Sequence, residues 1–219
     1  MKTLWLGAMC LAACGVARAQ TTILSYTFAG NTANAAVVNS NVTASAISTN
    51  GTVSISNSSP VASGYSGASG SYYAADNGWG TSANFFQLSI TPNPGQSVLL
   101  SSIVFGYRTS SSSGPTGFSL KSSVDGYTSA VASGTLTNAD TAWHAAGPAS
   151  ITLSAITAAT TLRLYATGAS TNTPTLRIDD LIITGSATAI PEPSAYVAIL
   201  GMLALMGAIT RRYRAQPAA

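Results

Sequence analysis

Residues 175–185 read TLRIDDLIITG, a run of apolar and polar residues with the pattern of a half-buried strand. Its apolar residues form two pairs of opposite parity, Leu176 with Ile178 and Leu181 with Ile183. The phase changes at Asp179 and Asp180, and successive side chains of a strand point to opposite faces. A β-bulge at the two aspartates would let both apolar pairs face one core. In a regular strand, Ile178, Asp180 and Ile182 would share a face instead, and Asp180 would need buried partners.

The same period-two alternation recurs along the chain, with β-branched and aromatic residues at the apolar positions. It occurs in ILSYTF (23–28), NFFQLSI (84–90), SSIVFGYR (101–108), GFSLKSS (117–123) and TLRLYATG (161–168). Turn signals such as Asn50-Gly51 and Asp125-Gly126 separate these runs. The pattern predicts an all-β, antiparallel two-sheet sandwich, jelly-roll-like, with an immunoglobulin-like sandwich as the alternative. Residues 31–69 are small and polar, and we expect edge strands or a long loop there.

Charged residues make up only 7% of the 219-residue chain, and the formal net charge of +3 comes from its ends. Residues 20–190 contain four cations against five aspartates, a net charge of −1. The cations are Arg108, Lys121, Arg163 and Arg177. Because they are scattered along the sequence, we expect no basic groove for nucleic acid.

The predicted sandwich is poor in catalytic groups. Its single histidine is His144, its acids are all aspartates, and both cysteines (Cys10 and Cys14) lie near the N-terminus. No G-x-S-x-G motif is present, and glycosidase chemistry would need two carboxylates facing each other across a cleft. We therefore expect a protein that is not an enzyme.

Two groups of residues could bind a ligand. Asp179 and Asp180, with oxygens from the AGNTAN loop (29–34), could form a weak Ca²⁺ site, although a bulge held by aspartate hydrogen bonds is the simpler reading. Apart from Ca²⁺, no cofactor is predicted. The stretch SGSYYAADNGWG (69–80) reads as an exposed aromatic loop, and its aromatic residues could stack on sugars or simply cover a sheet edge. They are Tyr72, Tyr73 and Trp79.

The first twenty residues, MKTLWLGAMCLAACGVARAQ, follow the pattern of a secretory signal peptide. One cation precedes a short apolar run, for which we expect a signal helix over residues 1–19. Ala17 and Ala19 are the small residues that a signal peptidase reads, and Gln20 is the expected new N-terminus. A competing signal, LAAC at 11–14, would instead make Cys14 a lipidated first residue.

The last thirty residues, IPEPSAYVAILGMLALMGAITRRYRAQPAA, combine two prolines, an apolar stretch and an arginine cluster. Residues 195–210 carry no charge and predict a short transmembrane helix of about 24 Å, against the roughly 30 Å of a hydrocarbon core. The arginines that follow, which predict a cytoplasmic stop signal, are Arg211, Arg212 and Arg214. An ordinary permanent anchor would show a similar pattern.

The triplet Pro191-Glu192-Pro193 with Ser194, followed by a short span and an arginine cluster, resembles the PEP-CTERM sorting signal. The resemblance implies an exported protein of a Gram-negative bacterium whose tail is removed by an exosortase-type enzyme. The implied route runs from an inner-membrane-anchored intermediate, with its body on the periplasmic side, to the cell envelope or the extracellular space. The closing strand also resembles the last strand of secreted jelly-roll and carbohydrate-binding-type modules.

These observations divide the chain into a signal peptide (1–19), a β-sandwich (20–188) and a sorting tail (189–219). The expected function is that of an envelope or matrix protein with a structural or interaction role. The alternative is a carbohydrate-binding module that attaches to exopolysaccharide. The expected partners are signal peptidase, an exosortase-type enzyme, the membrane through the tail and, in the alternative, a polysaccharide.

Overall fold

The computed structural model describes residues 20–50, 54–56, 63–69, 73–79, 84–138, 140–191 and 193–214. The predicted signal helix, with Cys14, Ala17 and Ala19, lies outside the described residues, as do Tyr72 and Glu192.

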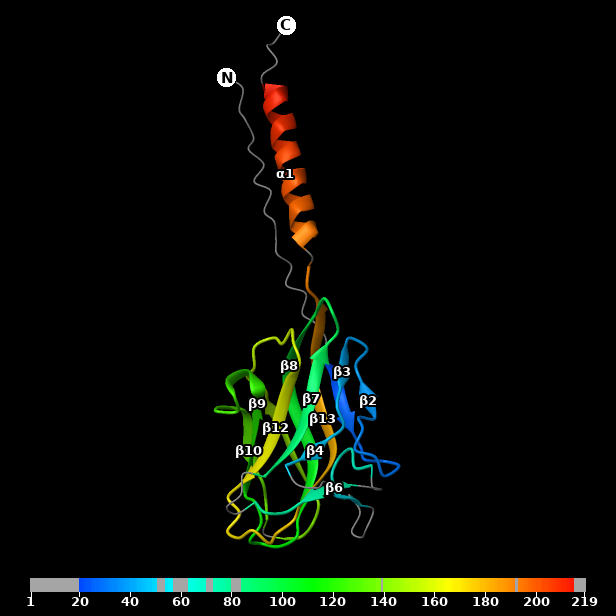
Figure 1. Ribbon diagram of the computed structural model, residues 1–219, viewed down its shortest axis with the longest axis vertical. Coiled ribbons are helices and arrows are strands. Elements are labelled where there is room, and N and C mark those ends of the chain that lie inside the picture. Colours follow the sequence, from blue (N-terminus) through cyan, green and yellow to red (C-terminus); the bar gives the residue numbers. More distant parts are fainter. Residues whose placement is uncertain are drawn as a thin grey trace.

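The described strands form two antiparallel sheets, shown in Figure 1. The first sheet has the order β11-β8-β13-β1-β2, with β6 paired to β13 and β5 paired to β6. Its strands are β1 (Thr21–Tyr26), β2 (Val37–Val38), β5 (Ser54–Ser56), β6 (Tyr73–Asp76), β8 (Gln96–Thr109), β11 (His144–Ser150) and β13 (Leu176–Ala189). The second sheet has the order β10-β9-β12-β7-β3, with β4 paired to β7. Its strands are β3 (Val42–Ala44), β4 (Ser48–Thr49), β7 (Phe85–Pro92), β9 (Gly117–Ser122), β10 (Ala130–Thr135) and β12 (Thr160–Thr167).

The predicted two-sheet sandwich is therefore confirmed. The alternating apolar residues of both sheets meet in one core, where Phe105 of β8 contacts Phe118 of β9 edge to face, with ring centroids 5.1 Å apart. Burial of each large apolar side chain contributes about 1.5–3 kcal/mol, so this shared core supplies most of the driving force for folding. Between residues 37 and 56 the strands have two or three residues each, as expected for edge strands.

Of the two readings of the closing strand, the bulge is the one that the structure contains. The register between β13 and β8 shifts between Asp179 and Ile182, and all four apolar residues of the two pairs lie in the core. The bulge coincides with a change of neighbour: β6 pairs with β13 before it, and β1 pairs with β13 after it. The irregularity thus keeps both halves of a 14-residue strand facing one core.

Beyond β13 the chain forms α1 (Pro193–Arg214), which extends from the end of the sandwich in Figure 1. Its described apolar side chains between Val197 and Ile209 are 46–68% exposed. We expected a transmembrane helix here. Among the described residues, however, no helix is both long enough and apolar enough to cross a membrane, so this expectation is not supported.

Candidate functional site

The two aspartates of the β13 bulge are held by a hydrogen-bond network rather than left open to solvent. Asp180 has a left-handed backbone (φ 45°), and its N–H donates to Oδ1 of Asp179 at 2.8 Å. Oδ2 of Asp180 accepts hydrogen bonds from the Tyr65 hydroxyl at 2.7 Å and from the Ser69 N–H at 2.8 Å. The bulge therefore fastens the segment 63–69 to the outer face of the first sheet.

Burial dominates the electrostatics of this network. Asp179 is 0% exposed, and burial together with the charge of Asp180 raises the pKa of Asp179 to about 7. The hydrogen bond from the Asp180 N–H opposes that rise in pKa. Burial and the hydrogen bond to Asp180 also raise the pKa of the Tyr65 phenol. Among the described residues, Oδ2 of Asp179 has no hydrogen-bond partner.

This geometry favours the simpler reading of the aspartate pair. Oδ1 of Asp179 and Oδ2 of Asp180 accept hydrogen bonds that fix the bulge. The donors to Asp180 come from the segment 63–69 and not from the loop at 29–34. In the described part of the chain, no three His, Cys, Asp or Glu side chains gather where they could hold a metal ion. The Ca²⁺ hypothesis gains no support here.

Of the aromatic side chains at 69–80, the structure describes that of Trp79, and this ring is not exposed as we expected. Trp79 is 3% exposed and packs on Phe86, with ring centroids 5.5 Å apart. Its Nε1 donates to the carbonyl oxygen of Asp76 at 2.9 Å, so the indole is buried with its polar group satisfied. The expectation of an exposed Trp79 is wrong, because a large apolar ring with a local acceptor is more stable in the core. Tyr73 lies in β6, and Tyr72 lies outside the described residues.

A different aromatic cluster lies on the outer face of the second sheet. Its side chains alternate with the core residues of three neighbouring strands, and one comes from the turn before β10. We call it the Arg163 platform, and it comprises Phe85, Gln87, Lys121, Tyr127, Arg163 and Tyr165. In the pairing register Arg163 lies opposite both Gln87 and Lys121, and Tyr165 lies opposite Phe85.

Arg163 is the centre of this platform. Its Cζ lies 4.1 Å from the ring centroid of Phe85 and 3.8 Å from that of Tyr127. Its Nε donates to Oε1 of Gln87 at 2.9 Å. These contacts hold the planar guanidinium by cation–π attraction and one hydrogen bond.

Lys121 and Tyr165 complete the platform beside this arginine. Nζ of Lys121 lies 5.5 Å from the centroid of Tyr165, and the rings of Tyr165 and Phe85 meet edge to face at 5.5 Å. The alternation of TLRLYATG places Arg163 and Tyr165 outward, but the sequence does not show which residues of other strands lie beside them. The platform was missed for that reason.

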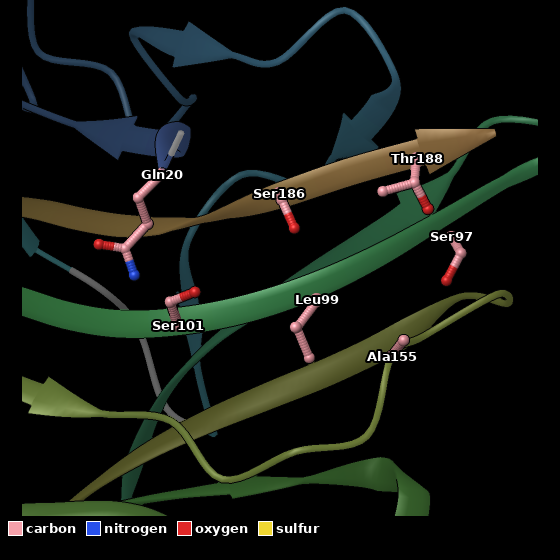
Figure 2. A pocket seen from close by; sticks show the side chains of 7 residues that line it. All are labelled: Gln20, Ser97, Leu99, Ser101, Ala155, Ser186 and Thr188. Atoms are coloured by element: carbon pink, nitrogen blue, oxygen red, sulfur yellow. The ribbon is translucent and has the colours of Figure 1, made fainter. Parts of the chain in front are cut away.

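An uncharged groove of about 530 Å³ lies on the outer face of the first sheet (Figure 2). Gln20, Ala155 and alternate residues of β8 and β13 line it; the strand residues are Ser97, Leu99, Ser101, Ser186 and Thr188. Figure 2 shows the hydroxyl groups of the serines and of Thr188 along the groove. Gln20, the expected first residue after signal cleavage, thus borders this groove immediately before β1.

The predicted sorting motif, Pro191 to Ser194, follows the last described hydrogen bond to the sandwich. The Ile190 N–H donates to the Gly95 carbonyl oxygen at 2.8 Å, and Pro191 is exposed immediately after it. Pro193 and Ser194 begin α1, and the arginines at its other end are Arg211, Arg212 and Arg214. The triplet therefore lies at the junction between the sandwich and the helix, with its glutamate outside the described residues.

Comparisons with known proteins give distant likenesses only. No family model matches the chain, and no curated protein matches it significantly. An arabinose-bound α-L-arabinofuranosidase, MgGH51, aligns over 75% of this chain and 27% of its own length, with 10% identity and a TM-score of 0.48. The K3 cleaved adhesin domain of Lys-gingipain from Porphyromonas gingivalis aligns over 74% of this chain and 98% of its own length, with 10% identity and a TM-score of 0.38.

A third likeness is to the CBM22-1-GH10 modules of xylanase 10B from Clostridium thermocellum, in complex with xylohexaose. It covers 78% of this chain and 30% of the xylanase chain, with 13% identity and a TM-score of 0.38. Sequence identities and TM-scores this low identify no function.

Proposed function

We propose that the chain is an exported cell-envelope or extracellular-matrix protein whose tail is removed at the Pro191–Ser194 junction by an exosortase-type enzyme. Its β-sandwich is non-catalytic and has a structural or interaction role. Before cleavage the protein is held at the inner membrane by its tail, with the sandwich on the periplasmic side. The resemblance of the tail to a PEP-CTERM signal motivates this proposal.

One structural observation supports it: the tail is separable from the body. The last described hydrogen bond between them joins Ile190 to Gly95, and no strand packs extensively against α1 in the described part of the chain. Prolines on both sides of the junction restrict the backbone and disfavour helix before α1 begins. A protease that cut after Ile190 would therefore leave the pairing of β13 intact.

The test is the intact mass of the protein from culture supernatant and from membranes. We expect a supernatant species that begins at Gln20 and ends between Pro191 and Ser194. Replacing both prolines of the triplet with alanine should leave the full tail on the protein, whereas Gln216→Ala, a tail change outside the triplet, should be processed normally. A wild-type protein that keeps residues 211–219 in every fraction would contradict the proposal.

Carbohydrate binding by the sandwich is a second candidate, and the Arg163 platform favours it. Sugar rings stack on aromatic side chains while polar neighbours bond their hydroxyls, and the platform offers half-buried Phe85, Tyr127 and Tyr165 beside Gln87. Retarded migration of the protein in gels that contain polysaccharide would test this function. Unchanged migration with both neutral and acidic polysaccharides would exclude it.

A further inference from the structure

We propose that the Arg163 platform binds an acidic polysaccharide through the carboxylates of its uronic acid residues. This inference rests on the carbohydrate-binding candidate function and adds the chemical class of the ligand and the residues that select it. It concerns a different surface from the aromatic stretch at 69–80.

The first argument is the uncompensated charge of the platform. Lys121 and Arg163 are direct cross-strand neighbours, and like charges in that position destabilise a sheet. Among the described residues, neither one has a carboxylate within ion-pair distance. Asp125, the acid nearest to Lys121 in the sequence, instead accepts hydrogen bonds from Thr128 and Ser129. A bound anion would relieve this repulsion.

The second argument is the preorganisation of the guanidinium. Two aromatic rings and Gln87 fix Arg163, and the one hydrogen bond that it makes in the described part of the chain uses Nε. Both Nη groups thus remain available as a planar pair of donors. Such a pair matches the two oxygens of a carboxylate, and little side-chain entropy is left to lose on binding.

The third argument separates a polysaccharide from other anionic polymers. Tyr165 is half-buried beside the cations and presents an apolar ring next to them, as a sugar ring with a carboxylate requires. A nucleic acid would draw most of its affinity from many phosphate contacts, and the platform contains only two cations. A polymer with spaced carboxylates and apolar sugar faces therefore fits the platform better.

The experiment compares binding of the full chain to polygalacturonate, to fully methyl-esterified polygalacturonate and to a single-stranded thymidine oligonucleotide. The esterified polymer keeps the sugar backbone but has no charge. We expect binding to polygalacturonate alone, weakened about tenfold or more by Arg163→Gln, as for the loss of a charge-assisted hydrogen bond. Lys121→Gln should also weaken binding. The hydrogen bond from Nζ of Lys121 to the Thr128 carbonyl oxygen, at 3.4 Å, is solvent-exposed, so this variant should fold normally.

The matched control is Arg108→Gln, which removes one positive charge from the other sheet and should bind as the wild type does. Equal binding of the esterified and charged polymers would overturn the choice of ligand but leave the carbohydrate-binding function standing. Binding of neither polymer would overturn both. Tighter binding of the oligonucleotide, lost in Arg163→Gln, would assign the platform to nucleic acid instead.

Discussion

Asp180 carries backbone strain at the bulge, and its side chain offsets that strain. A left-handed conformation is unfavourable for a residue with a Cβ, although aspartate tolerates it better than most. The carboxylate of Asp180 receives two hydrogen bonds, each of which contributes about 1.5–3 kcal/mol when the acceptor is charged. The bulge is thus stable because the segment 63–69 supplies the donors.

The buried Asp179 should make the stability of the fold depend on pH. Its pKa in the folded protein is about 7, above the ordinary aspartate value of 3.8, so the folded state binds the proton more tightly. The contribution of Asp179 to the free energy of unfolding should therefore be largest below about pH 4 and should be lost as the pH rises through 7. Each unit of raised pKa corresponds to about 1.4 kcal/mol.

Urea unfolding of the wild type and of Asp179→Asn between pH 4 and pH 8 would measure this dependence. The asparagine variant lacks the titrating group, so it should gain stability relative to the wild type as the pH rises, by about 4 kcal/mol between pH 4 and pH 8. Asp125 and Asp140, whose pKa values are lowered by hydrogen bonds, titrate in both proteins and cancel in the difference. A difference that does not change with pH would contradict the assignment to Asp179.

Trp79 should contribute to stability rather than to ligand binding. Truncation of a buried aromatic side chain in a core usually costs about 3–5 kcal/mol, and Trp79→Ala would also remove the contact with Phe86. We expect a large drop in the urea midpoint for Trp79→Ala and a smaller one for Trp79→Phe. If Trp79→Ala unfolded at the wild-type midpoint, the burial of the indole would be disproved.

At the scale of elements, the segment 63–69 and β13 depend on each other. The Tyr65 ring lies directly over Gly106 of β8, where any Cβ would collide with it, and it also packs against Trp143. The glycine lets the ring approach the sheet closely enough for its hydroxyl to reach Asp180. Tyr65, Gly106 of β8 and Asp180 of β13 are therefore all needed to hold the segment 63–69 on the sheet.

Tyr65→Phe should loosen this fastening without removing the ring. It deletes the hydroxyl that donates to Asp180 and leaves one of the two bonds to that carboxylate, for an expected loss of about 1–3 kcal/mol. Hydrogen exchange of the Ser69 amide should become faster. Tyr127→Phe removes a hydroxyl outside the network and should leave that exchange rate unchanged, whereas equal acceleration in both variants would rule out a local effect.

Alternation in the sequence predicted the strongly alternating strands and offered the bulge in β13 as one of two readings, because burial of apolar residues on one face determines both. It did not predict β10 or β11. It could not predict which outward residues would gather, since Phe85, Lys121 and Arg163 come from strands whose pairing depends on the whole sheet. The error at Trp79 has a related cause. Gly78 has a positive φ of 85°, and its N–H bonds to the Asn172 carbonyl oxygen from a distant loop, a long-range contact that local sequence does not reveal.

At the scale of the whole molecule, β13 links the core to the tail. It lies between β8 on one side and β6 and β1 on the other, and it leads through Ile190 into the tail. Its last four residues, Ser186 to Ala189, pair with β8 alone among the described strands, so a pull on the tail is borne first by the backbone hydrogen bonds to β8.

Removal of the tail should therefore leave the sandwich as stable as before. A chain that ends at Ile190 keeps all the described pairings of β13 and loses only α1, whose described apolar side chains are exposed. We expect its thermal midpoint to match that of the full chain within about 1 °C, because no buried area is lost.

A chain that ends at Gly185 is the matched control. It loses the residues of β13 that pair with Gln96 to Leu99 of β8, and it should melt several degrees lower. A lower midpoint for the chain that ends at Ile190 would mean that α1 packs on the sandwich and that the tail is part of the fold.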